Sequence, residues 1–174
     1  MIADTMKRRT LPAGFLMLAL ALSSCSTGRS PFLREESRRI SPEEAYRLGK
    51  LKNTPYSING RVYVPMSYEQ ALAYEEVGMA SWYGHETLKK NNGQPTAYGE
   101  QFDPSAPSAA HKYLPLPSVV RVTNLENSQS IVVRVNDRGP FVDDRIIDLS
   151  AEGARRLGFY QKGTARVRVE VISE

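Results

Sequence analysis

Three residues in the second half of the chain, Glu100, His111 and Asp137, are the first candidates for holding or transferring protons. Asp137 closely follows the apolar run Val132–Val135 and precedes Arg-Gly-Pro, which predicts a strand that stops at a carboxylate and turns sharply. Such a strand end would deliver the carboxylate to the mouth of a sheet or barrel. Glu100 and His111 fall in two upstream segments that we expect to be irregular, where binding and catalytic groups tend to collect. Together they predict a site driven by carboxylates.

Asp137 is the first candidate for a general acid and base. Partial burial at the end of an apolar strand would raise its pKa and help it to keep a proton. Two other interpretations remain open from the residues alone. Asp137 could cap the Arg-Gly-Pro turn, or it could pair with Arg134 or Arg138.

The histidines give no indication of a metal site. His85 and His111 are the only two in the chain, and they are far apart without a ligand-spaced partner, so we expect no metal. His85 follows Gly84 in a polar segment, and we expect it to be an exposed loop residue. Nothing resembles a phosphate loop, a nucleophile elbow or a nucleotide fingerprint, so we expect no cofactor.

Residues 1–24 predict a secretory signal, with Lys7–Arg9 as its basic region and Leu11–Leu22 as its apolar region. The apolar run is too short for a stable membrane-spanning helix, which needs about 20 residues. The following Leu-Ser-Ser-Cys resembles a bacterial lipobox, whose cysteine is acylated and becomes the new N-terminus. Cys25 is the only cysteine, so it has no internal disulfide partner. Ser26 after it favours the outer membrane; the alternative is an ordinary signal peptide with an incidental cysteine.

The charge balance gives no indication that the protein binds nucleic acid, and it excludes few other functions. The chain has 23 basic and 19 acidic residues, of which three and one lie in residues 1–24, so the mature chain has 20 and 18 and a net charge of +2. Nucleic-acid binders usually show a clustered basic face, whereas these charges are mixed. We therefore expect no nucleic-acid partner.

The mature chain of 150 residues is long enough for one domain. We expect a lipidated cysteine, tether and accessory segment over 25–76 and a compact domain over 77–172. Ser41-Pro42-Glu43-Glu44 predicts the start of a short helix that ends near Gly49. Asn59-Gly60, inside residues 56–65, predicts a β-hairpin that packs as an accessory flap.

Short strands dominate the rest of the sequence. They are expected over Val77–Tyr83, Ser118–Asn124, Ser130–Val135, Ile146–Leu149 and Ala165–Val171. The last of these alternates strictly between apolar and charged residues, which indicates one buried face. Ser150 should cap a helix over Ala151–Leu157 that stops at Gly158. About six strands without a long apolar helix predict a small closed barrel.

Four motifs follow one another along this region: Gly78–Gly84, Thr96–Asp103, Ala109–Pro117 and Val135–Phe141. In this order they resemble the motifs of the rare lipoprotein A family, septal and endolytic peptidoglycan lytic transglycosylases that are distantly similar to expansins. The resemblance covers about residues 77–172 and agrees with the lipobox. It implies a mainly β fold, a six-stranded double-psi β-barrel with one or two short helices.

The resemblance also implies a reaction, cleavage of the β-1,4 bond between N-acetylmuramic acid and N-acetylglucosamine without water. The muramic acid's C6 hydroxyl attacks C1 and leaves a 1,6-anhydro ring, so one acid/base suffices, and Asp137 is the implied group. Glu100, expected at a loop-to-strand transition, would position the substrate, stabilise positive charge at C1 or perturb Asp137; otherwise it is a surface acid. His111 would bind the sugar, hold a carboxylate in place or satisfy a backbone carbonyl.

Trp82, Tyr83 and Arg138 are candidate substrate-binding residues. Aromatic faces stack well on sugar rings, although Trp82 and Tyr83 could equally be packing residues. Many relatives carry a C-terminal glycan-binding domain. The sequence ends at Glu174, soon after the barrel, so we expect that domain to be missing.

Two other functions remain open. The barrel could serve a non-catalytic peptidoglycan-binding or cell-division scaffold lipoprotein, since fold alone does not decide function. A hydrolase would need a second carboxylate about 5–10 Å from Asp137, a role that Glu100 could fill. We expect glycan strands as substrate, the membrane as lipid attachment, cell-division or cell-wall proteins as candidate partners, and the bacterial periplasm as location.

Overall fold

The structure is a computed structural model that describes residues 39–90 and 93–172. The predicted signal sequence, Cys25 and the tether up to residue 38 lie outside these residues. Within the described part of the chain, no helix is both long and apolar enough to cross a membrane.

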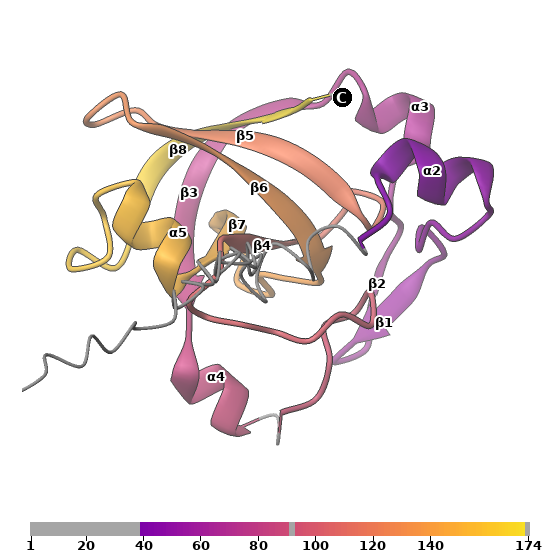
Figure 1. Cartoon of the computed structure of the whole chain (residues 1–174), viewed down its shortest axis with the longest axis horizontal. Coiled ribbons are helices and arrows are strands. Elements are labelled where there is room, and N and C mark those ends of the chain that lie inside the picture. The colour runs from indigo at the N-terminus through magenta and orange to yellow at the C-terminus, as the bar shows by residue number, and fades with distance from the viewer. Residues whose placement is uncertain (1–38, 91–92, 173–174) are drawn as a thin grey trace, which may run out of the picture. The chain divides into compact units, whose positions relative to one another are not determined.

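Six strands form a closed barrel in the order β3-β7-β4-β6-β5-β8 (Figure 1). Their bounds are β3 Glu75–Tyr83, β4 Ser108–His111, β5 Ser118–Asn124, β6 Ser130–Asp137, β7 Arg145–Ser150 and β8 Ala165–Val171. The pairs β3–β7 and β4–β6 are parallel, and the other neighbours are antiparallel. The predicted mainly β, six-stranded barrel is therefore confirmed.

Alternating strand residues fill the barrel. In β8, Ala165, Val167 and Val169 are fully buried while Arg166 and Arg168 are exposed, as the sequence pattern predicted. The two predicted central strands, β5 and β6, form a hairpin whose loop covers residues 125–129. Each of the six strands contributes aliphatic side chains to one core cluster, which α5 covers with Ala154.

The described residues contain four short helices, whereas we expected one or two. They are α2 Pro42–Arg47, α3 Tyr68–Ala71, α4 His85–Lys90 and α5 Ala151–Arg156. As predicted, Ser41 and Ser150 begin α2 and α5, because each side chain accepts a backbone N–H three residues further on. The sequence analysis missed the capping box of Ser67 and Gln70 that starts α3.

A small hairpin packs on the barrel, as predicted. Its strands are β1 Tyr56–Ile58 and β2 Arg61–Tyr63. Asn59 and Gly60 form the turn with φ angles of 51° and 77°, the left-handed conformation that an Asn-Gly turn requires. Tyr63 stacks on Tyr56 and also lies against Phe141, with ring centroids 5.4 Å apart in the latter pair.

Three expectations about local structure were wrong. His111 is the last residue of β4, not part of an irregular segment. Glu100 lies in the loop between α4 and β4, not at a loop-to-strand transition. His85 is exposed as expected, but it begins α4. The sequence analysis missed β4 because Ser-Ala-Ala-His contains no β-branched residue and no Tyr, Phe or Trp.

Candidate active site

The end of β6 places Asp137 where the chain turns away from the barrel. The turn is possible because Gly139 adopts a φ of 131°, which favours glycine. Asp137 Oδ1 accepts the backbone N–H groups of Ala97 and Arg138, each at 2.8 Å. No hydrogen bond to Oδ2 is formed within the described residues. One carboxyl oxygen is therefore fixed and the other is free to meet a ligand.

Burial raises the pKa of Asp137 above its ordinary value. The two backbone N–H groups and the charge of Arg138 oppose this shift without cancelling it. Burial disfavours the charged form of a carboxyl group, so Asp137 holds its proton more readily than a solvated aspartate. The side chain caps its own turn through Arg138, as one open interpretation had it, but Arg134 pairs with a different acid.

That acid is Glu100, and its carboxylate is fully engaged. Arg134 Nε and Nη2 both donate to Glu100 Oε1, at 2.9 and 2.8 Å, and Asn136 Nδ2 donates to Oε2 at 2.8 Å. Burial alone would raise the pKa of Glu100, but the hydrogen bonds from Arg134 and Asn136 outweigh it, and the pKa is lowered. Glu100 therefore holds a negative charge that is anchored to β6.

The turn over residues 96–100 connects the two carboxylates. The N–H of Ala97 binds Asp137, and the N–H of Tyr98 donates to the carbonyl of Asn136 at 3.0 Å. Glu100 closes the same turn, because its carbonyl accepts from Thr96 at 2.8 Å. The ion pair of Glu100 thus holds against β6 the turn that supplies a hydrogen bond to Asp137.

His111 lies on the inner side of the barrel wall with only 1% of its surface exposed. Its Nδ1 accepts the N–H groups of Tyr113 and Leu114, at 3.1 and 2.9 Å. Nε2 lies 2.8 Å from the hydroxyl of Tyr74, which in turn donates to Glu76. Burial, followed by the charges of Arg138 and Lys112, lowers the pKa of His111 to about 3. The ring is therefore neutral, and both its nitrogens have protein partners.

Trp82 and Tyr83 point to opposite faces of β3, as neighbouring strand residues must. Trp82 packs against the core cluster, stacks on Tyr160 at 4.4 Å and donates its indole N–H to the Tyr160 carbonyl. Tyr83 stacks on Phe102 at 4.6 Å, and its hydroxyl is buried. Burial and the charges of Asp137 and Asp148 raise the pKa of Tyr83. Of the two aromatics, only Tyr83 is thereby brought into the field of Asp137.

Arg138 holds backbone segments together. Its guanidinium donates to the carbonyls of Leu114 and Lys52, the latter at 2.7 Å, and it lies over the ring of Tyr56 at 5.1 Å. Its predicted contact with substrate stays a prediction. The contacts that it makes within the protein fasten the N-terminal hairpin segment to the barrel beside Asp137.

The sequence analysis did not single out Asp148, in the middle of β7. Its Oδ1 accepts a hydrogen bond from Ser81 Oγ at 2.6 Å, and its Oδ2 lies 3.7 Å from a guanidinium nitrogen of Arg145. Burial raises its pKa, against the effects of Ser81, Arg145 and Lys112. The available signal was a lone acid inside the apolar run Ile-Ile-Asp-Leu, which a fully buried strand would not be expected to contain.

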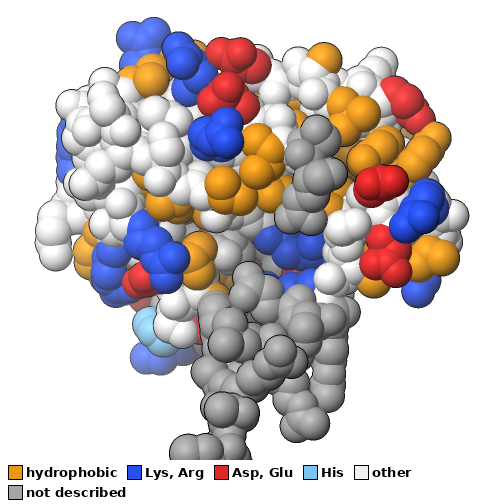
Figure 2. Space-filling model, turned by 45° about the horizontal axis from the view of Figure 1, so that its top comes forward, with side chains coloured by type: hydrophobic (Ala, Val, Ile, Leu, Met, Phe, Trp, Pro, Cys, Tyr) orange, Lys and Arg blue, Asp and Glu red, His pale blue; other side chains and the backbone are white. Residues whose placement is uncertain are grey.

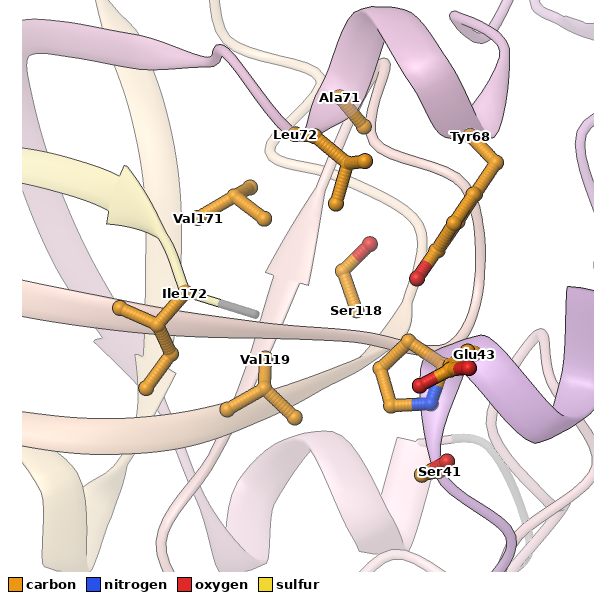
Figure 3. A pocket seen from close by; sticks show the side chains of 10 residues that line it. Ser41, Glu43, Tyr68, Ala71, Leu72, Ser118, Val119, Val171 and Ile172 are labelled. Carbon is orange, nitrogen blue, oxygen red and sulfur yellow. The ribbon is translucent and has the colours of Figure 1, made fainter. Parts of the chain in front are cut away.

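A separate cavity lies between α2, α3, the start of β5 and the end of β8 (Figure 3). Its lining includes Tyr68, Ala71, Leu72, Val119 and Val171. At about 50 Å³ it is far smaller than a typical ligand pocket of about 300–1,000 Å³. It also contains none of the predicted site residues, so it is not the candidate active site.

The surface carries charges of both signs. Figure 2 shows Lys and Arg side chains interspersed with Asp and Glu and with apolar side chains on the face in view. Within residues 39–90 and 93–172, no three His, Cys, Asp or Glu side chains are grouped so that they could hold a metal ion. The strongest chemical feature of the described chain is therefore the group of carboxylates around β6.

Comparison with known proteins adds a family. The family model described as "Lytic transglycolase" matches residues 75–169. A protein from Pseudomonas aeruginosa (strain UCBPP-PA14), named "Endolytic peptidoglycan transglycosylase RlpA", is 56% identical over 124 residues, 71% of this chain and 35% of the relative. Proteins of the same name from Neisseria meningitidis (serogroup B) and Vibrio cholerae are 46% and 42% identical, over 74% and 91% of this chain. The chain covers 52% and 62% of those two relatives, so it spans less than two thirds of all three.

Proposed function

Because this chain belongs to the rare lipoprotein A family of lytic transglycolases, we propose that it cleaves the β-1,4 bond between N-acetylmuramic acid and N-acetylglucosamine in peptidoglycan strands. The relatives' name, endolytic peptidoglycan transglycosylase, supports this substrate and reaction class. The observation that carries the proposal is the pair of unlike environments of Asp137 and Glu100. A raised pKa and one free oxygen suit Asp137 to proton transfer, whereas Glu100 is ionised and fully bound.

In the first step, the carboxyl group of Asp137 donates its proton to the oxygen that links C1 of the muramic acid to the next sugar. The bond between C1 and this oxygen breaks, and the leaving sugar departs with a hydroxyl group. Positive charge is left on C1 and the ring oxygen of the muramic acid. Positioned proton transfer of this kind accelerates reactions by about 10²–10⁴-fold.

In the second step, the C6 hydroxyl of the same muramic acid attacks C1 and forms the 1,6-anhydro ring. The proton of that hydroxyl passes to the carboxylate of Asp137, which regains the state in which it began. No water is consumed, so one acid/base serves both steps. A free Oδ2 meets this need, since the same atom can donate the proton and later accept one.

Glu100, His111 and Arg138 enter this proposal as positioning residues. Glu100 holds the turn that binds Asp137, and Arg138 fastens the carbonyls of Leu114 and Lys52 next to it. His111 fixes the chain after β4 through the N–H groups that it binds. These contacts hold the general acid in one geometry, which proton transfer to a bound sugar requires.

Digestion of purified glycan strands, with and without stem peptides, tests the proposal. Mass spectrometry should find products that end in 1,6-anhydro-N-acetylmuramic acid. Products with a reducing end would instead identify a hydrolase. If neither substrate is cut but glycan is retained in a pull-down, the non-catalytic binding function is the correct one.

The proposal includes a lipid anchor in the bacterial periplasm, most simply at the outer membrane. It rests on the predicted signal over residues 1–24 and on the lipobox cysteine, Cys25. Cells that express the chain should incorporate labelled palmitate into it, and Cys25→Ser should abolish the label. Labelling that survives this substitution would contradict the anchor. The same cells, fractionated and cross-linked, would reveal any cell-wall or cell-division partner.

A further inference from the structure

Pairing across the barrel wall places Asp137 and Asp148 on either side of one small residue. Ala110 of β4 is paired with Asp137 of β6 and also with Asp148 of β7, which is paired with Ser81 of β3. The strands β7, β4 and β6 are neighbours in the barrel (Figure 1). Adjacent strands are about 4.8 Å apart, so the two aspartate backbones are separated by about two such steps.

Both carboxylates belong to the outer face of this wall. The residues that flank Asp148, Ile147 and Leu149, are fully buried in the core, so Asp148 points the other way. Ala110 shares that face, because a residue and its direct cross-strand partner lie on the same side of a sheet. The register of β4 and β6 shifts between Ala109–Val135 and Ala110–Asp137, so a β-bulge lets Asn136 and Asp137 both oppose Ala110 and turns Asp137 to its face. The hydroxyl of Tyr83 lies close enough to both Asp137 and Asp148 for their charges to raise its pKa, which agrees with this arrangement.

This part of the wall also contains buried polar atoms without partners. In the described residues, four such side-chain atoms occur, and all come from β3, β4, β6 and β7. They are Tyr83 Oη, Ser108 Oγ, Asn136 Oδ1 and Arg145 Nε. Buried polar atoms in proteins are nearly always hydrogen-bonded, and exceptions often mark a functional site. Tyr83 Oη and Ser108 Oγ lie close enough for Ser108 to lower the pKa of Tyr83, and all four atoms are shielded from solvent. Their concentration on four neighbouring strands marks this wall as the incompletely hydrogen-bonded part of the described barrel.

The carboxylate of Asp148 is costly in this position. Its side chain is only 15% exposed, and its ion pair with Arg145 is long, at 3.7 Å. Anchoring β7 to β3 through Ser81 would not require the charge, because an asparagine oxygen could accept the same hydrogen bond. The hydrogen bond to Ser81 therefore does not account for the charge, and the long ion pair with Arg145 accounts for it only in part.

We propose that Asp148 is a second catalytic carboxylate, which faces the sugar across Ala110 from Asp137 and stabilises the positive charge that develops at the anomeric carbon. The inference rests on the proposed function and adds a residue to it. Ser81 and Arg145 favour the charged form of Asp148 against the effect of burial, while Asp137 supplies the proton. We assign the role of second carboxylate to Asp148 and not to Glu100, because both oxygens of Glu100 accept short hydrogen bonds from Arg134 and Asn136. Oδ2 of Asp148 has only the 3.7 Å contact with Arg145.

Substituting Asp148 with Asn tests this directly. Asn keeps the size of the side chain and the acceptor for Ser81 but loses the charge. On glycan strands that the wild type cleaves, we expect kcat to fall about 100-fold, the size typical of losing one electrostatic contact to a transition state. KM should change little, whereas the melting temperature should fall, because Arg145 loses its counter-charge.

The pH profile separates a catalytic from a structural role. The charged groups around Asp148 are Arg145 on its own strand, Lys112 after β4 and Asp137 on β6, and the neutral but titratable Tyr83 lies on β3. Catalysis needs Asp148 ionised, so the wild-type rate should fall as the pH is lowered through the pKa of Asp148. Because burial raises this pKa, the fall should occur at a pH above the ordinary aspartate value of 3.8. The Asp148→Asn variant should lack this acid limb and keep the alkaline limb of Asp137.

Asp143→Asn is the matched control, because it makes the same chemical change on the loop before β7. Asp143 is 87% exposed and pairs only with Arg61 among the described residues, so the rate should not change. A wild-type kcat and pH profile in Asp148→Asn would overturn the inference. Wild-type protein that leaves no 1,6-anhydro ends would overturn the proposed function, and the inference with it.

A second variant covers the case in which Asp148→Asn does not fold. Ser81→Ala removes the hydroxyl that donates to Asp148 and leaves the carboxylate in place. Loss of that donor makes the charged form less favourable, so the acid limb of the rate profile should move to higher pH. An acid limb that stays where the wild type has it would contradict a catalytic Asp148.

Discussion

Two sets of polar residues lie in and beside the wall formed by β3, β7, β4 and β6, and they differ in how completely they are hydrogen-bonded or ion-paired. The anchored set comprises two pairs, Glu100 with Arg134 and His111 with Tyr74. The charges of the first pair neutralise each other, and both ring nitrogens of His111 have hydrogen-bond partners. The open set comprises Asp137, Asp148 and Tyr83, each of which has an oxygen that is free or weakly paired.

The difference separates stability from chemistry. A fully bound group cannot change its protonation or accept a new partner without breaking contacts, so the anchored set holds the fold in place. An incompletely bound group has lost hydrogen bonds to water and has replaced only some of them with protein contacts. It therefore favours a ligand that provides the missing hydrogen bonds. We therefore expect substitutions in the open set to lower the rate of cleavage and substitutions in the anchored set to lower the free energy of unfolding.

The largest expected effect is that of Asp137→Asn. The side chain keeps its size and its acceptor for the N–H groups of Ala97 and Arg138 but can no longer transfer a proton. Cleavage should fall by about 10³-fold, within the range for loss of a general acid and base. Release of anhydro products, followed by mass spectrometry, measures the rate, and a glycan pull-down should show that binding is retained.

The melting temperature of Asp137→Asn should equal or exceed that of the wild type, because a carboxyl group with an unfavourable burial has been removed. If the variant cuts glycan as fast as the wild type, Asp137 is not the acid/base. If activity and melting temperature fall together, Asp137 belongs to the anchored set and the contrast drawn here is wrong.

The second expected effect is that of Glu100→Gln on stability. Gln can still bind Asn136, but it leaves the guanidinium of Arg134 buried without its counter-charge; the two side chains are 15% and 12% exposed. Removing one partner of such a pair costs about 3 kcal/mol in free energy of unfolding. Urea unfolding followed by circular dichroism measures this. A loss smaller than that of the exposed-pair control Glu126→Gln, whose partner is Lys162, would contradict an anchoring role.

Most of the barrel could be predicted from the sequence because its signals are local. The alternation of β8, the serine caps of α2 and α5 and the Asn59-Gly60 turn each depend on a few consecutive residues. β4 was missed because its small residues do not predict a strand. The strand forms because β6 and β7 pair with it on either side. The short α3 and α4 were missed for the related reason that helices of four or six residues show no periodicity.

The site was predictable only in part, for a similar reason. Asp137 stands at a strand end that local sequence reveals, and Glu100 was a candidate through its motif. That Glu100 would pair with Arg134, and that Asp148 would lie across Ala110 from Asp137, depends on strand register between distant segments. Register of this kind is set by the whole core, so a single strand's sequence does not contain it.

The third expected effect is a loss of stability in acid caused by His111. Its pKa is about 3 in the fold and about 6.5 when solvated, so below pH 6.5 the unfolded chain binds a proton that the folded chain does not. The contribution is fully present above pH 6.5 and is lost as the pH falls toward 3, by about 1.4 kcal/mol per unit. Unfolding of the wild type and of His111→Asn, measured at pH 7.5, 6.0 and 5.0, isolates this contribution.

His111→Asn keeps an oxygen near Nδ1 for the N–H groups of Tyr113 and Leu114 but does not titrate. It should be less stable than the wild type at pH 7.5, because a large buried ring has been replaced by a smaller side chain. The difference between the two proteins should then narrow as the pH falls. A difference that stays constant from pH 7.5 to 5.0 would show that the ring is not held neutral.

The smallest expected effects come from two tyrosine hydroxyls that belong to opposite sets. The Tyr83 hydroxyl is buried beside Ser108 and makes no hydrogen bond of good geometry within the described residues, so Tyr83→Phe should leave stability nearly unchanged. If that hydroxyl serves the substrate, cleavage should fall by less than about tenfold, since one neutral hydrogen bond contributes about 1 kcal/mol.

The Tyr74 hydroxyl binds His111 and Glu76, so Tyr74→Phe should cost about 1–2 kcal/mol in free energy of unfolding. The same substitution would thus act mainly on rate at one position and mainly on stability at the other. The opposite result would be a destabilised Tyr83→Phe and an unchanged free energy of unfolding for Tyr74→Phe. It would place the ligand-facing side of the wall on the inside of β4, and both proposals would lose their basis.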